Sequence, residues 1–282
     1  LGTSIKDSRE ISDIVAERLP MTIELTVFAT AFSSLLGVTL GVVSAVRHNS
    51  AIDVGATVFA NIGVSMPIFW LGLLLAYLFA LTLAGTPFQL PPSTRLTSGA
   101  DLPSLLKVWG LEDATGLQRF LLLMLSNSVI LNSIIQGKWD ILGDALKHMI
   151  LPTVTVGTVS LAIIARMTRG AMLDVLTQDF IRVARAKGLR EWAVIMKHAF
   201  RNALVPVVTI IGLQFGGLLS GAVLTETTFN LPGVGTKLID AILSRDYPVV
   251  QAFTVIVALF FVLVNIMVDI SYAYLDPRIR TK

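Results

Sequence analysis

The chain has 282 residues, of which 54% are hydrophobic and only 15% are charged, and its formal net charge is +3. A soluble domain carries about 25% charged residues, so this composition leaves too little polar surface for a globule and indicates a membrane protein. The small positive charge is unevenly placed, which favours a role in orienting the chain in a bilayer over nucleic-acid binding, and the lack of cysteine excludes disulfides and thiolate metal sites.

Residues 1–20 are polar and mixed in charge, and we expect no signal peptide in them. Five later segments are apolar enough to cross a hydrocarbon core of roughly 30 Å, which takes about 20 helical residues. The predicted spans are 21–46, 54–84, 149–166 with extension to 145–176, 202–225 and 247–268. Pro67 lies near the middle of the second span, where its missing N–H favours a bend. The predicted fold class is an all-α membrane protein.

A sixth apolar segment, FLLLMLSNSVILNSII at 120–135, is short and contains several Ser and Asn residues. Charge bias argues against a crossing here, because Lys and Arg collect on the cytoplasmic side. With five spans, the basic residues at 47–48, 166–201 and 278–282 all face the cytoplasm. We therefore expect 93–144 to form an external subdomain inserted after the 21–92 helices, with 120–135 as a buried or interfacial helix.

Five spans and a cytoplasmic C-terminus place residues 1–20 outside the cell. Something must carry that segment across the membrane, and a further helix upstream of residue 1 is the simplest expectation. Six spans are then expected in total.

The loop at 177–201 is predicted to be cytoplasmic and contains QDFIRVARAKGLREW. Thr177 or Asp179 can cap the start of a helix there, and Gly188 suits its C-terminal cap. Phe180 and Ile181 are expected to share one face with Ala184, with the basic residues elsewhere. Such a helix is too short to be stable alone, so it needs a docking surface.

Three interpretations of this helix remain open from periodicity. It can be an ordinary positive-inside loop whose arginines touch lipid phosphates. It can be an amphipathic helix that lies on the membrane. It can also be a docking helix for a cytoplasmic protein, because Ala184, Ala186 and Gly188 let a partner groove approach the backbone.

Glycine spacing predicts close helix packing. Gly37 and Gly41 form one G-x-x-x-G pattern, and two more come from a second group in the 202–282 region. The members of that group are Gly212, Gly216, Gly217 and Gly221. They can pack within this chain or against a second subunit, and spacing does not decide which.

The loop at 225–247, TETTFNLPGVGTKLIDAILSRDY, is predicted to lie outside. Pro232, Gly233 and Gly235 force a turn, so the loop cannot be plain helix. The sequence has no G-x-x-x-x-G-K-[ST] pattern, so ATP hydrolysis must occur on a partner if the protein uses ATP.

Several motifs follow one another in a characteristic order: RLPMTIELT, KHMILPTVTVG, ARMTRGAMLDVL, FIRVARAKGL with HAFRNALVP, ETTFNLPGVG, RDYPVVQAFT and YLDPRIR. This series resembles the ABC importer permeases of the dipeptide, oligopeptide and nickel branch, over nearly the whole chain. The resemblance implies a helix that sits in a cleft of the ATPase subunit. Its residues here are Phe180, Ile181, Arg182, Val183, Ala184, Arg185, Ala186, Lys187 and Gly188.

The general family pattern is Glu-Ala-Ala, three residues, then Gly. Here Arg182, Val183 and Ala184 stand at the Glu-Ala-Ala positions, and Gly188 matches the glycine. An ion pair of the acidic residue is therefore not carried over to this chain.

The resemblance also implies the partners. They are a second homologous permease, two ATPase subunits and an external substrate-binding protein, in a complex surrounded by the lipid of the bacterial inner membrane. The chain is then a transport subunit rather than an enzyme, with no cofactor of its own, because ATP and Mg bind the ATPase subunits.

Within the chain, the resemblance places the span with Gln214 and its glycines near the translocation path. It makes 225–247 a re-entrant segment beneath the binding protein, and we expect Glu226, Pro232, Gly233 and Gly235 to help close an outer gate. Peptides are the expected substrate, with nickel or another small solute as the alternative. A proton-coupled secondary transporter would need titratable groups at mid-membrane, and a membrane scaffold would leave the ETTFNLPGVG loop unexplained.

Overall fold

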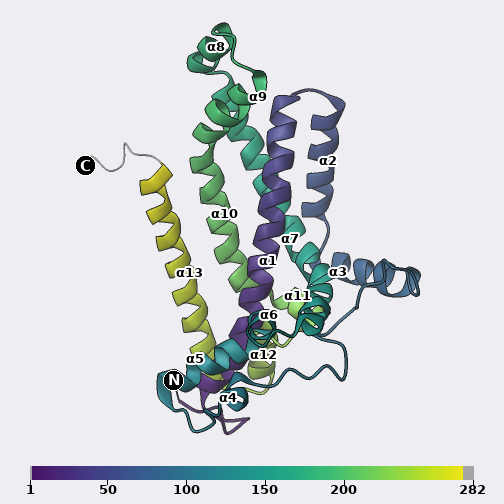
Figure 1. Cartoon of the computed structure of the whole chain (residues 1–282), viewed down its shortest axis with the longest axis vertical. Coiled ribbons are helices and arrows are strands. Elements are labelled where there is room, and N and C mark those ends of the chain that lie inside the picture. The colour runs from purple at the N-terminus through teal and green to yellow at the C-terminus, as the bar shows by residue number, and fades with distance from the viewer. Residues whose placement is uncertain (1, 276–282) are drawn as a thin grey trace. The chain divides into compact units, whose positions relative to one another are not determined.

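The computed structural model describes residues 2–275, and within them every regular element is helical apart from an isolated bridge between Thr3 and Glu10 (Figure 1). This confirms the predicted all-α class. The predicted cytoplasmic C-terminus, with its basic residues at 278–282, lies outside the described residues. The elements in chain order are α1 Ile11–Val46, α2 Ala51–Ser65, α3 Ile68–Ala76, the π-helix η1 Tyr77–Thr82, α4 Leu105–Val108, α5 Gly116–Asn127, α6 Val129–Ile135, α7 Trp139–Leu176, α8 Asp179–Ala186, α9 Glu191–Ala193, the π-helix η2 Val194–Phe200, α10 Arg201–Gly221, α11 Val223–Thr228, α12 Val234–Leu243 and α13 Tyr247–Leu275.

Within residues 2–275, four continuous helical segments are long and apolar enough to cross a membrane, and the number rises to six if each of two bent helix pairs counts as one span. The five predicted spans fall within this range. The four continuous segments are Ile11–Val46, Trp139–Leu176, Glu191–Leu219 and Tyr247–Val268.

The predicted bend in the second span is a complete break. Met66 is extended, with φ −78° and ψ 132°, and the helix resumes only at Ile68. The cause is Pro67, whose ring disfavours helical geometry in the residue before it. The span therefore consists of two helices, α2 and α3.

The apolar segment at 120–135 is also not one straight helix. It divides between α5 and α6, which meet at Ser128 with a bend of 93°. At 1.5 Å per residue, α5 is about 18 Å long and α6 about 10 Å. Each is shorter than the roughly 30 Å hydrocarbon core, so 120–135 could cross only as a bent pair.

The chain divides into two compact units. The first unit comprises Leu1–Phe28, Ile68–Val156 and Leu218–Phe261. The second unit comprises Ala29–Pro67, Gly157–Gly217 and Val262–Lys282.

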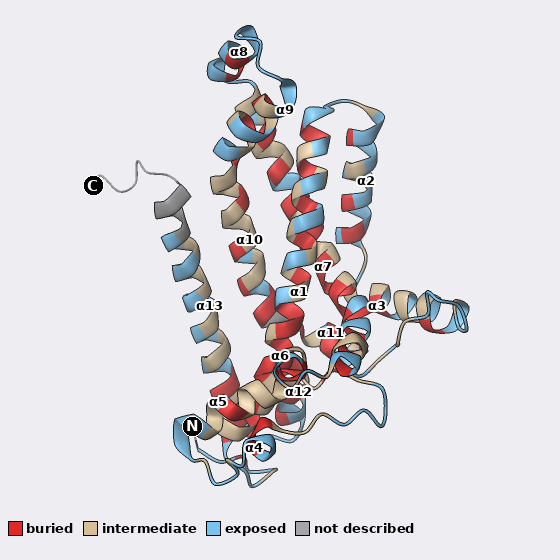
Figure 2. Ribbon diagram, in the orientation of Figure 1, coloured by how far each residue is buried: buried red, intermediate tan, exposed pale blue. Residues whose placement is uncertain are grey.

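The core of the first unit explains why α1 begins at Ile11, well before the predicted span at 21–46. Four apolar side chains in the polar N-terminal stretch recur every three to four residues and bury one helix face, red in Figure 2. They pack with α12 and the start of α13. These side chains are Ile11, Ile14, Val15 and Leu19, and their partners include Val234, Ala241, Val249 and Phe253.

Glu24 belongs to the same unit and is buried rather than reaching out to the interface. Its carboxylate lies 2.6 Å from a guanidinium nitrogen of Arg95 and accepts hydrogen bonds from the Ser128 hydroxyl and the Ile130 amide. An acidic group inside an apolar helix is thus paired, as burial of a charge requires.

In the second unit, α2 runs beside residues 29–46 of α1 (Figure 1), and both pack on α7. A Cβ atom at Gly37 would lie 2.9 Å from the carbonyl oxygen of Leu161, and one at Gly41 would lie 2.6 Å from Cβ of Thr168. The first G-x-x-x-G pattern therefore serves helix packing within this chain, since only glycine leaves room for the approach.

Candidate functional site

The basic loop forms the short helix α8, and its inner face is held by its own chain. Ile181 and Ala184 are buried in a cluster with Met172 of α7 and with Val194 and Ala199 of η2. This packing provides the surface that so short a helix needs. In Figure 2 the rest of α8 is largely exposed.

The outer side of α8 presents apolar groups among basic ones. Phe180 is 44% exposed and Val183 is 51% exposed, and Arg182 and Lys187 are exposed beside them. The sequence predicts that Phe180 shares one face with Ile181 and Ala184. In the structure Ile181 and Ala184 are buried and Phe180 is exposed, because Ile181 points about 100° away from Phe180 and faces the cluster with Met172. The face free to meet a partner carries Phe180 and Val183.

The ends of α8 agree only in part with the predicted caps. Gly188 has φ +73°, the left-handed conformation that ends a helix, as predicted. Gln178, not Thr177 or Asp179, is the N-cap residue, and its side chain makes no capping hydrogen bond. Beyond the helix, Arg185 pairs with Glu191 at 2.7 Å and fixes the exit of the chain.

The turn between α11 and α12 in the first unit is organised around Glu226. The carboxylate is completely buried. Its Oε1 accepts a 2.6 Å hydrogen bond from the Thr22 hydroxyl, and its Oε2 accepts a 3.1 Å bond from the Thr236 amide. The Val234 amide in turn donates to the Thr22 hydroxyl at 2.9 Å. The carboxyl group of Glu226 thus accepts hydrogen bonds at the N-terminus of α12, where free amides need acceptors.

The two glycines of the turn make this arrangement possible. A Cβ atom at Gly233 would lie 2.2 Å from Cδ of Glu226. One at Gly235 would lie 2.6 Å from Cα of Val223 and 2.9 Å from Oε2 of Glu226. Gly233 has φ −99°, which any residue adopts, so space and not backbone conformation requires glycine here. Pro232 precedes this turn, as predicted, and the loop is not plain helix.

Burial raises the pKa of Glu226 above its ordinary value, although hydrogen bonds from Thr22 and from the amides of Thr236 and Gly235 act in the opposite direction. Desolvation penalises the charged form, whereas donors to the carboxylate favour it. The balance leaves a carboxyl group that takes up a proton more readily than an exposed glutamate.

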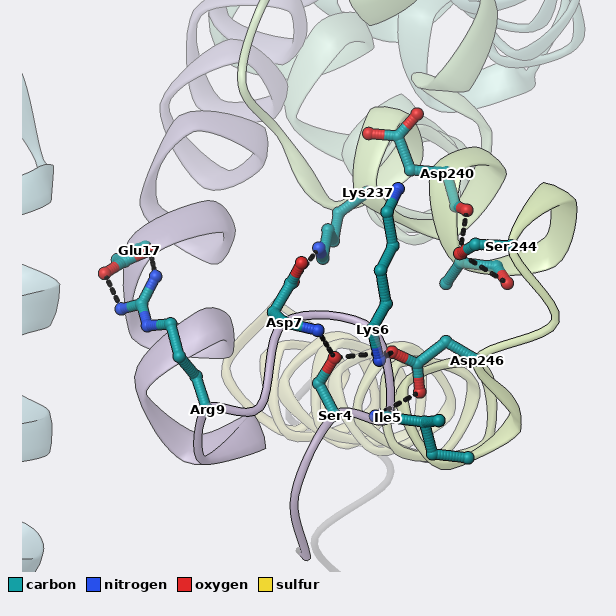
Figure 3. A network of polar contacts seen from close by, with 11 residues as sticks. Ser4, Ile5, Lys6, Asp7, Arg9, Glu17, Lys237, Asp240, Ser244 and Asp246 are labelled. Atoms are coloured by element: carbon teal, nitrogen blue, oxygen red, sulfur yellow. Dashed lines mark hydrogen bonds and ion pairs between the residues drawn. The ribbon is translucent and has the colours of Figure 1, made fainter.

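The far end of the 225–247 loop is tied to the N-terminal residues, as Figure 3 shows. The carboxylate of Asp246 accepts hydrogen bonds from the Ser4 hydroxyl and from the amides of Ile5 and Lys6. Lys237 of α12 pairs with Asp7. Burial alone would raise the pKa of Asp246, but these donors hold it below its ordinary value.

Gln214 and the second glycine group lie on α10 in the second unit. The Ser160 hydroxyl donates to Oε1 of Gln214 at 3.2 Å, so this amide is held by α7. A Cβ atom at Gly212 would lie 2.0 Å from Val268 of α13, whereas one at Gly217 would meet nothing within 4 Å. Gly216 is buried, and the surroundings of Gly221 fall outside the described part of the chain. Gly212 thus allows α10 to pack against α13 within the chain, whereas the surface of α10 at Gly217 has no neighbouring helix against it in the part of the chain that the structure describes.

Sequence reasoning missed the partners of the predicted residues. Thr22 and Thr236 form the hydrogen bonds that shape the turn, and Asp246 binds the N-terminal residues. A hydroxyl 204 residues from its partner gives no local signal in the sequence.

Comparison with known proteins gives a consistent result. The family described as "binding-protein-dependent transport system inner membrane component" matches residues 37–281. The dipeptide transport system permease protein DppB of Alkalihalophilus pseudofirmus is 44% identical over 280 residues, which cover 99% of this chain and 77% of the relative. The di/tripeptide permease DppB of Pseudomonas aeruginosa is 43% identical, with 99% and 76% covered.

The dipeptide permease DppB of Escherichia coli K12 is also 43% identical, over all of this chain and 77% of the relative. Similarity of this extent includes the α8 loop, the turn at Glu226 and the long apolar helices. The chain belongs to the family of inner-membrane components of binding-protein-dependent transport systems.

Proposed function

We propose that this chain is the permease subunit of an ATP-driven peptide importer and forms half of the path by which peptides cross the inner membrane. The observation that carries the proposal is the similarity, over 99–100% of the chain, to permeases named for dipeptide or di/tripeptide transport. A nearly complete match supports the same task for the whole subunit, not for one shared segment.

In this proposal α8 docks in a cleft of an ATPase subunit on the cytoplasmic side, and the C-terminus lies on that side too. The exposed pair Phe180 and Val183 supports this role, because apolar groups at the centre of an interface contribute most of its affinity. ATP and Mg bind the two ATPase subunits. A second homologous permease completes the path, and an external binding protein delivers the substrate.

The turn at Glu226 is proposed as part of the outer gate, beneath the binding protein. Its support is the set of hydrogen bonds that connects Thr22 of α1, Glu226 of α11 and the start of α12. For the path itself, Gln214 supplies a polar group on α10, and Gly217 leaves an open surface on which the second permease can pack.

The test is uptake by the complete complex in proteoliposomes. We expect a labelled dipeptide to accumulate only with the binding protein and internal ATP, and not when the phosphate-binding lysine of the ATPase subunits is replaced. Nickel accumulation without dipeptide accumulation would reject the peptide assignment. Dipeptide uptake driven by a proton gradient in the absence of ATP would reject ATP-driven import.

A further inference from the structure

A cavity of about 380 Å³ lies between α1, α2 and α7 in the second unit. Much of its wall is apolar, with side chains such as Leu40, Ala60 and Ala165. Its strongest polar groups are the guanidinium groups of Arg166 and Arg169 and the amide of Asn61. Two positively charged groups at one apolar cavity in a membrane-spanning segment each need a partner, because an unpaired charge there costs free energy.

Arg169 is already compensated. Its Nε lies 2.7 Å from Oδ1 of Asp53 and its Nη2 lies 2.9 Å from Oδ2, a two-point ion pair. Asp53 is held in turn by the Ser44 hydroxyl and the Asn49 amide. The pair closes the end of the cavity next to the turn between α1 and α2, and its net charge is zero.

Arg166 has no such partner. Its Nη2 donates to the neutral amide oxygen of Asn61 at 3.0 Å. Among the residues that the structure describes, no carboxylate forms an ion pair with it. Its side chain is exposed at the cavity, so a full positive charge with free donors remains. A guanidinium group of this kind matches a phosphate oxygen pair in geometry and charge.

Exposed apolar side chains adjoin the cavity. Leu36 lies one turn from Leu40 on the same face of α1 and is 40% exposed. On α2, Val58 and Ile62 form an exposed apolar stripe beside Asn61. A ligand that fits both the cation and this surface has an anionic head and an apolar tail, which a small anion or a peptide carboxylate lacks.

We propose that this cavity binds the headgroup phosphate of an anionic phospholipid, with Arg166 as the group that pairs with the phosphate and Asn61 as the group that holds Arg166. The acyl chains lie along Leu36, Val58 and Ile62. Lipid at this position fills the space between α1, α2 and α7. The site is independent of the peptide assignment, because its ligand is not the transported solute.

The experiment measures lipid retention by the complete purified transporter with native mass spectrometry, after equilibration with phosphatidylglycerol or with phosphatidylcholine of the same chains. One basic residue near a lipid surface predicts about a fivefold preference for the anionic lipid. Arg166→Gln is expected to abolish this preference, and Arg166→Lys to keep most of it. Lys197→Gln, an exposed basic position outside the cavity, is the matched control and should leave it unchanged.

Two further arms separate the sources of the anion. Inorganic phosphate or a dipeptide in excess should not displace phosphatidylglycerol, and displacement by either would overturn the proposal. Equal retention of both lipids, or an unchanged preference in Arg166→Gln, would also overturn it. If the Arg166→Gln complex does not assemble, Asn61→Leu provides the test. This change removes the hydrogen bond that holds Arg166, so the preference for phosphatidylglycerol should fall, and an unchanged preference would contradict the site.

Discussion

The Thr22 hydroxyl donates to Glu226 at 2.6 Å and accepts from the Val234 amide at 2.9 Å, so one side chain of α1 connects both sides of the turn between α11 and α12. All three groups are buried, where each lost hydrogen bond leaves an unsatisfied partner. The turn therefore has one well-defined position relative to the N-terminal part of α1.

Replacement of Gly233 and Gly235 by valine should abolish peptide uptake while the complex still assembles. The new side chains would overlap the Glu226 carboxyl group and the Val223 backbone, and overpacking costs about 1–3 kcal/mol per site. Uptake by proteoliposomes and size-exclusion chromatography of the complex measure the two effects. Gly143→Ala, where a Cβ meets nothing within 4 Å, is the control. Normal uptake in the double variant would contradict a role of this turn in the gate.

Val183→Glu should uncouple ATP hydrolysis from uptake without unfolding the permease. Val183 is 51% exposed, and a carboxylate placed there would be buried in the interface without a partner, which costs about 2 kcal/mol or more, roughly thirtyfold in affinity. The ATPase rate and uptake of the reconstituted complex give the measurement. If ATP hydrolysis remained fully coupled to uptake in this variant, the proposal that α8 contacts the ATPase subunit would be contradicted.

Ala184→Trp serves as the contrasting variant on the same helix. Ala184 is buried against its own chain, so the indole has no room, and the permease should lose stability and assembly instead of coupling alone. Yield and the thermal midpoint of the purified subunit distinguish this outcome from that of Val183→Glu. A stable, assembled Ala184→Trp complex would contradict the packing of α8.

Glu226 should make the thermal stability of the permease depend on pH. Its folded-state pKa is raised above 4.5 by burial, so the folded state binds the proton more tightly than the unfolded state. The stability that results is fully present below pH 4.5 and is lost as the pH rises through the folded-state pKa of Glu226. The thermal midpoint of the native protein relative to Glu226→Gln should therefore be higher at pH 5 than at pH 8. A difference that stays constant over this interval would show that the carboxyl group does not titrate there.

Asp53→Asn should lower the thermal midpoint more than Ser44→Ala does. Removal of one partner from a buried ion pair usually costs about 3 kcal/mol or more in unfolding free energy. Arg169 is 30% exposed, so we expect a loss at the lower end of that range, about 3 kcal/mol. Loss of the Ser44 hydroxyl removes one hydrogen bond, which contributes about 1 kcal/mol. Differential scanning fluorimetry in detergent compares the two, and equal midpoints would show that the ion pair adds no stability.

Features set by local chemistry were predictable from the sequence. The apolar runs predicted the long helices, Pro67 predicted the break between α2 and α3, and Gly188 predicted the end of α8. Each depends on a residue's own backbone or on a periodic pattern within one helix.

Features set by distant partners were not predictable. Ile11 belongs to α1 because α12 and α13 bury its face, and Ile181 and Ala184, but not Phe180, are buried against α7 and η2. The lone Glu24 is neutralised by Arg95, 71 residues away. Such contacts depend on tertiary packing, which overrides local propensity.

Gly233 and Gly235 lie close to the carboxyl group of Glu226, so the residues allowed at these three positions depend on one another during evolution. A Cβ atom at Gly233 overlaps the carboxyl group of Glu226, so alanine there requires this side chain to move and to give up its hydrogen bonds with Thr22 and Thr236. A sequence lineage that carries Asp at 226 relieves this overlap, so variation at Gly233 should accompany loss of the longer acid.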